Sequence, residues 1–230
     1  MDGSMTPARR RRNVRGSPWE RLAPLSGIVA VAAVAVAAAL VGVYDYLPSG
    51  ERLVDVFSRN PNNLVASGLV GNLGAFLVFW FAGCVYRVMR AAGRGDGWLS
   101  VVAAGGGAAT AVVLGIGFSA LIATGSRAGA GSGLSSTEAV TLYDFTSNVL
   151  GQLLGVTMAV FMISASAAWL GSRQLPAWFK WASVAVGVTL LTPAAYLFLI
   201  FALAWMAVVS VWLLRAGMAV DEAVGSAAAA

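Results

Sequence analysis

The sequence predicts an all-α protein: a polytopic membrane helical bundle of about six transmembrane helices, with both termini on the cytoplasmic side. Two features of composition predict this class. Of the 230 residues, 59% are hydrophobic and 11% are charged, whereas soluble domains average about 45–50% and about 25%. So few charges cannot cover the surface of a soluble domain. The third observation is a succession of long apolar segments separated by polar ones.

Six apolar segments are expected to form the spans, since about 20 apolar residues cross about 30 Å of hydrocarbon. The last two come from one apolar region, 177–215, which as a single helix would extend about 58 Å. Pro193 divides it, because proline removes a helix hydrogen bond and restricts the residue before it. The fifth span is then short, so local bilayer thinning and a re-entrant fold both stay open. The predicted spans cover about residues 25–47, 64–89, 98–124, 142–170, 177–191 and 194–214.

The two ends of the chain differ from this apolar middle. Residues 1–24 are basic, with scattered Gly, Pro and Ser, and are predicted to be a disordered cytoplasmic tail. Residues 216–230 end in four alanines and are also predicted to be disordered. A basic stretch before an apolar one is also typical of a signal peptide. The first apolar segment is longer than the usual h-region of about 7–15 residues, which favours an uncleaved first span.

The distribution of basic residues predicts the orientation. Of the 15 Lys and Arg residues, all but Arg52, Arg59 and Arg127 fall on the same side as the N-terminus in this arrangement. Cytoplasmic loops carry the excess of Lys and Arg, so both termini are expected in the cytoplasm.

Composition also excludes several kinds of chemistry. The chain has no histidine, which excludes an imidazole base, a Ser-His-Asp triad and histidine-held haem, and makes the common zinc sites unavailable. Cys84 is the single cysteine and cannot form an internal disulfide. No cofactor or metal is expected. No nucleic-acid partner is expected either, because the basic residues lie beside apolar helices.

Polar residues inside the apolar segments are the candidate functional residues, because they are costly in lipid. Asp144, Asn148 and Gln152 are spaced four residues apart and so share one face of the fourth span. Asn72 lies among small residues of the second span, at a similar depth to Asn148, and Asp45 ends the first span on the same side. One interpretation is a polar cavity, open outward, that binds a ligand or an ion. The other is hydrogen bonding between closely packed helices, with both aspartates hydrated at helix ends.

Other features have structural interpretations. The basic run could bind anionic lipid headgroups as well as set the topology; it consists of Arg9, Arg10, Arg11 and Arg12. The glycine-rich third span predicts close helix approach or, alternatively, a broken helix. Lys180 is expected to be a snorkelling anchor.

The segment Gln174-Leu-Pro176-Ala-Trp178-Phe-Lys180-Trp181 resembles the start of the fifth helix in a broad group of uncharacterised six-helix bacterial membrane proteins of the domain-of-unknown-function kind, common in actinobacteria. Tyr86-Arg87-Val-Met-Arg90 and the closing Val211-Trp212-Leu-Leu-Arg215 are also similar. The resemblance covers about residues 25–215. It implies a helical membrane fold in a bacterial plasma membrane, and it implies no activity.

The function expected from these features is non-enzymatic: binding of a hydrophobic or small polar ligand, or partnership with another membrane protein or a second copy of the chain. A small-solute or ion transporter is the first alternative. A membrane-embedded enzyme that uses the outer-side carboxylates is the second.

Overall fold

The computed structural model describes residues 22–42, 49–91, 97–130, 133–170, 175–192 and 195–229. Every regular element in these ranges is a helix, which confirms the all-α prediction. In chain order the helices are α2 (Leu25–Val41), α3 (Gly50–Arg59), α4 (Pro61–Ala91), α5 (Gly97–Gly129), α6 (Ser136–Asn148), the π-helical turn η1 (Val149–Leu153), α7 (Leu154–Trp169), α8 (Ala177–Thr189) and α9 (Ala195–Ala229).

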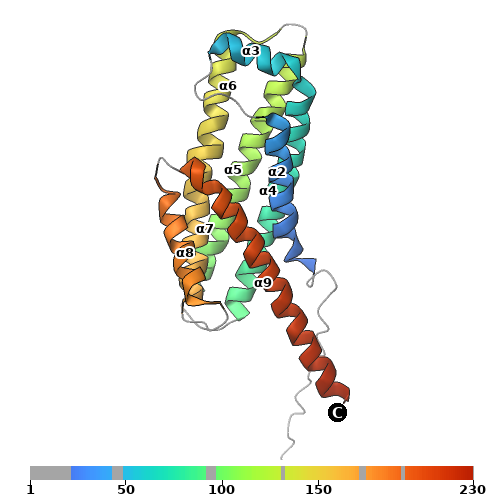
Figure 1. Cartoon of the computed structure of the whole chain (residues 1–230), viewed down its shortest axis with the longest axis vertical. Helices are drawn as coiled ribbons and strands as arrows, with labels where there is room; N and C mark the ends of the chain where they lie inside the picture. Colours follow the sequence, from blue (N-terminus) through green and yellow to red (C-terminus); the bar gives the residue numbers. More distant parts are fainter. Residues whose placement is uncertain are drawn as a thin grey trace, which may run out of the picture.

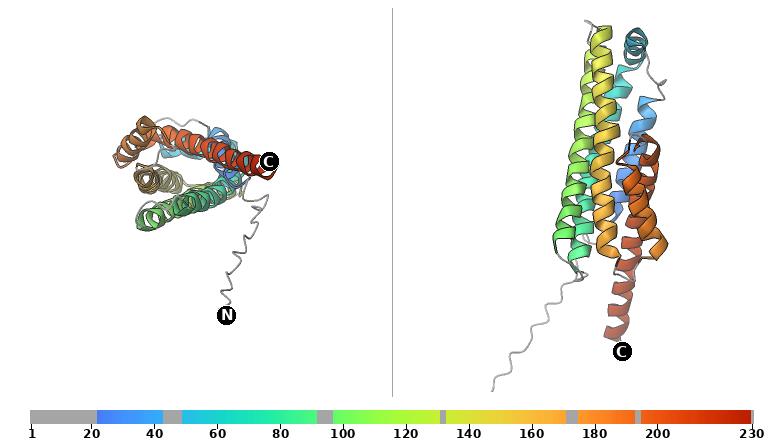
Figure 2. Two further views of the ribbon diagram at one scale, coloured as in Figure 1. Left: turned by 90° about the horizontal axis from the view of Figure 1, so that it is seen from below. Right: turned by 90° about the vertical axis from the view of Figure 1, so that its left-hand side faces the viewer.

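Three long helical rods form the body of the molecule: α4, α5 and the continuous rod α6–η1–α7 (Figures 1 and 2). Helix α5 packs between α4 and α7, and α2 packs on α4. Helix α8 packs on α7, and α9 runs diagonally across the bundle and continues past its lower end (Figure 1). Helix α3 lies across the opposite end of the bundle (Figure 1).

Four helical segments are long and apolar enough to cross a bilayer, which indicates a membrane protein. They are Pro61–Arg90, Gly97–Gly129, Ser136–Trp169 and Phe198–Arg215. Helix α2 is apolar but has 17 residues, and α8 has 13. At 1.5 Å per residue α8 extends about 20 Å, less than the hydrocarbon thickness of about 30 Å. The predicted break in the region 177–215 is confirmed, since α8 ends at Thr189 and α9 begins at Ala195. Six spans and the orientation stay predictions.

Two segments differ from the sequence-based expectation. The polar segment between the first two spans contains the amphipathic helix α3, which buries Leu53 and Phe57 against the bundle. Ser49 caps it by accepting from the backbone N–H of Arg52, a contact of 3.4 Å. The tail expected to be disordered is helical as far as Ala229, as a continuation of α9. Alanine, which has the highest helix propensity of any residue type, recurs throughout this segment and favours the helix.

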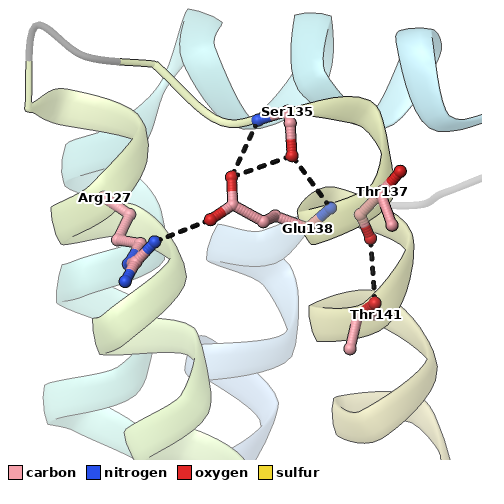
Figure 3. A network of polar contacts seen from close by, with 5 residues as sticks. All are labelled: Arg127, Ser135, Thr137, Glu138 and Thr141. Carbon is pink, nitrogen blue, oxygen red and sulfur yellow. Dashed lines mark hydrogen bonds and ion pairs between the residues drawn. The ribbon is translucent and has the colours of Figure 1, made fainter.

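A capping box fixes the start of α6 and ties it to α5 (Figure 3). The Ser135 hydroxyl accepts from the Glu138 backbone N–H at 3.3 Å, and the Glu138 carboxylate accepts from the Ser135 backbone N–H at 3.0 Å. The same carboxylate accepts from Arg127 of α5 at 2.8 Å. Two backbone donors at the helix start are thereby satisfied, and the ends of α5 and α6 are held together.

Glycines let the long rods approach backbone to backbone. A Cβ on Gly106 of α5 would lie 2.8 Å from the backbone nitrogen of Phe161 in α7, and one on Gly68 of α4 would lie 2.6 Å from the carbonyl oxygen of Phe118. Helix α5 is unbroken from Gly97 to Gly129. Gly106 and Gly117 of the third span therefore serve close helix packing, and the broken-helix alternative is wrong.

Candidate functional site

An apolar cavity of about 490 Å³ lies inside the bundle, between α2, α5, α6–η1–α7 and α9. Phe57 of α3 closes one end. We call this cavity the slot. Aliphatic and aromatic side chains make up most of its wall, including Val34 on α2, Leu114 and Phe118 on α5, Leu150 and Met158 on the α6–η1–α7 rod, and Ala202 on α9.

The slot is elongated along the helix axes. On α5 its wall extends from Thr110 to Thr124, which are about 21 Å apart at 1.5 Å per residue. On the facing rod it extends from Leu142 to Met158. A volume of this size in so long a space describes a narrow channel and not a round chamber.

The position of the α8–α9 turn explains why the slot exists. A Cβ on Gly155 of α7 would lie 2.8 Å from the carbonyl oxygen of Leu190 and 2.9 Å from Cβ of Ala195, so the turn rests on this glycine. Helix α9 therefore begins part-way along the bundle, well below α3 (Figure 1). Between α3 and the start of α9, the slot is bordered by α2, α5 and α6.

The wall has few polar groups, and two of them are satisfied within their own helix. Thr110 donates to the carbonyl of Gly106 and Thr124 to that of Ala120, each at 2.8 Å. Thr146 differs: its hydroxyl oxygen is buried and has no hydrogen-bond partner among the described residues. An unsatisfied buried hydroxyl is unfavourable by about 1–3 kcal/mol.

The predicted polar residues of the fourth span share one face, as expected, but that face lies on the outside of the bundle. Asp144, Asn148 and Gln152 are all exposed. They line a shallow groove with Phe145, Val149, Leu153 and Val156, so all of its lining residues come from the one rod. Asn148 donates to the backbone carbonyl of Asp144 at 2.7 Å. These three residues do not enclose an internal cavity.

Asn72 is not brought to this groove. Its side-chain nitrogen lies 3.3 Å from the hydroxyl of Ser119 on α5, a hydrogen bond between neighbouring helices of the kind that the alternative interpretation describes. Asp45 lies outside the described residues, and so does the run of Arg9, Arg10, Arg11 and Arg12. A role for any of these residues in ligand or lipid binding stays a prediction.

Lys180 differs from its predicted role as a snorkelling anchor. It is 5% exposed. Its ammonium group donates to the carbonyl oxygens of Trp169 at 3.2 Å and Leu170 at 3.1 Å. These carbonyls belong to the last turn of α7. Carbonyl oxygens there have no N–H donor within the helix, and they carry partial negative charge. Lys180 thus caps α7 and fastens α8 to it.

No group of three or more acidic or cysteine side chains in the described residues could hold a metal ion. No family model, no curated protein and no solved structure matches this chain. The resemblance to the six-helix family of unknown function therefore stays a prediction.

Proposed function

We propose that this chain is a membrane-embedded binding protein that holds one elongated apolar molecule, of the lipid acyl-chain or isoprenoid class, in the slot. The observation that carries the proposal is the slot itself: about 490 Å³ of narrow, almost wholly apolar space inside a bundle of membrane-crossing helices. Pockets that bind apolar ligands share this size and lining. Filling the slot would also restore the dispersion contacts that its wall lacks.

The expected position of the bilayer places the slot beside one leaflet. Three exposed tryptophans lie at the lower end of the bundle, Trp98 at the start of α5 and Trp178 and Trp181 at the start of α8. Exposed tryptophans favour the interface between lipid and water. Measured along α5 from Trp98, the slot begins about 18 Å away and ends about 39 Å away. It therefore covers the far half of a hydrocarbon layer of about 30 Å and continues past its boundary.

This position suits uptake of a molecule from the leaflet on the α3 side. An acyl chain would enter the apolar lower part of the slot, and a polar end would lie near α3, outside the hydrocarbon. We propose that this leaflet is the outer leaflet of a bacterial plasma membrane. The chain then has six spans and both termini in the cytoplasm. Binding is favoured over ion transport because the wall offers few polar groups along its length.

The test is to fill the slot and measure lipid retention. Leu114 lines the slot and is 4% exposed, whereas Val112, two residues away on α5, is 59% exposed. Leu114→Trp is expected to abolish the tightly held lipid that native mass spectrometry detects on the detergent-purified wild type. Val112→Trp, the matched control, is expected to retain it.

A second filling variant gives an independent test in case Leu114→Trp does not fold. Ala202→Phe fills the slot from α9, and it is expected to lower lipid retention in the same way while the helical circular dichroism is unchanged. Equal retention by the wild type, both filling variants and the control would overturn the proposal, and so would a wild type that carries no lipid.

A further inference from the structure

The outer face of the α6–η1–α7 rod exposes amides inside the apolar part of the chain. We call Asp144, Asn148 and Gln152 the polar stripe. Gln152 lies about 26 Å from Trp169 at the lower end of the rod, inside a hydrocarbon layer of about 30 Å, and Asn148 lies close to its boundary. Lipid offers no hydrogen-bond partner for the remaining donors and acceptors of an amide that faces it, which is unfavourable. Asn148 donates one hydrogen bond, to the Asp144 carbonyl of its own rod at 2.7 Å, whereas the amide of Asn72 bonds Ser119 of a neighbouring helix.

The π-helical turn keeps the polar stripe straight. In a regular α-helix a step of four residues turns about 40° past a full circle, so residues spaced by four drift around the helix. The turn Val149–Leu153 holds one extra residue and offsets this drift between Asn148 and Gln152. Large apolar side chains are exposed beside the stripe: Phe145 is 48% exposed, Leu153 46% and Val156 43%. The face is therefore a row of amides bordered by large apolar side chains.

A second copy of this chain fits this face. All copies insert in the same orientation, so the simplest dimer has its twofold axis along the membrane normal and sets each residue opposite its own copy at the same depth. A group pairs with itself only if it both donates and accepts, which the amides of Asn148 and Gln152 do. Asp144 as a carboxylate only accepts, but it lies one turn further out, beyond the expected hydrocarbon, where water hydrates it.

We propose that the polar stripe is a homodimer interface, in which Asn148 and Gln152 bond their own copies and the flanking Leu153 and Val156 pack beside them. This inference goes beyond the proposed ligand binding and does not depend on it. Thr146, Leu150 and Leu154 of the same rod line the slot, so the dimer face and the slot use different sides of one helix.

Cysteine crosslinking in lipid vesicles tests the geometry. In a Cys84→Ser background, Gln152→Cys is expected to give a disulfide-linked dimer on mild oxidation, because the axis brings the two copies of this position together. Val112→Cys on the exposed face of α5 is the control and is expected to stay monomeric. Crosslinking of Gln152→Cys no faster than that of Val112→Cys would overturn the proposal.

Association of the unmodified surface provides the second measurement. Single-molecule photobleaching of the labelled full chain in vesicles gives the dimer fraction at each protein density. Asn148→Leu with Gln152→Leu is expected to weaken dimerisation about tenfold, since it removes two amide contacts. Asn72→Leu removes an amide elsewhere and is expected to leave dimerisation unchanged. A wild type that is monomeric at all densities, or a double variant that dimerises as well as the wild type, would contradict the interface.

Discussion

Helix α5 has two contrasting sides. Toward α4 and α7 it forms what we call the glycine interface, where Gly106 meets Phe161 and Gly68 of α4 meets Phe118 at backbone distance. Toward α2 and α9, the same helix borders the slot, where Leu114 faces open space. The difference shows that side-chain size decides how closely these apolar helices meet, because hydrophobicity is nearly the same on every side. In lipid, where burial gives little driving force between helices, small residues bring backbones together.

The largest expected effect comes from adding one methyl group to the glycine interface. Gly106→Ala would place a Cβ 2.8 Å from the backbone nitrogen of Phe161, and backbone cannot move aside cheaply. We expect a loss of about 1–3 kcal/mol in the free energy of unfolding, as for other overpacked sites. Equilibrium unfolding in mixed micelles with increasing SDS measures this loss.

The neighbouring residue is the matched control for that substitution. A Cβ on Gly105 would meet nothing within 4 Å. Gly105→Ala is therefore expected to leave stability unchanged or to raise it by up to about 1 kcal/mol through helix propensity. If the two alanine variants lost the same stability, close packing could not be the reason for the glycine at 106.

A smaller effect is expected on the slot side. Thr146→Val keeps the shape of the side chain and removes the buried hydroxyl that has no partner among the described residues. We expect a gain of about 1 kcal/mol in the free energy of unfolding in the same SDS titration.

Thr124→Val is the control on the same wall, because the Thr124 hydroxyl already bonds the carbonyl of Ala120. It is expected to be neutral or slightly destabilising. A loss of stability in Thr146→Val, larger than that in Thr124→Val, would mean that the Thr146 hydroxyl is satisfied in the membrane.

The sequence predicted the parts of this fold that depend on local signals. Pro193 correctly separated the last two helices, and the long apolar segments matched the long rods. Asp144, Asn148 and Gln152 do share a face, but the side to which it points was not predictable. Helix α7, the lower part of this span, is apolar all round, so nothing in its pattern distinguishes the bundle side from the lipid side.

The slot could not be found from the sequence, because its lining residues are the same types that fill a close-packed core. In the sequence, Leu114 cannot be distinguished from a leucine of a close-packed core. It borders open space because the α8–α9 turn rests on Gly155 and starts α9 below α3, which is a tertiary effect. Helix α3 did have a local signal, since Leu53 and Phe57 are four residues apart after the cap at Ser49.

Photocrosslinking with a diazirine-bearing palmitic acid tests occupancy of the slot most directly. The full chain would be labelled in vesicles, and the modified residues mapped by peptide mass spectrometry. We expect saturable labelling of slot residues such as Leu114, Leu150 and Met158, competed by excess unlabelled palmitic acid. Labelling confined to lipid-facing residues such as Val112 and Phe76, without saturation, would contradict a bound apolar ligand.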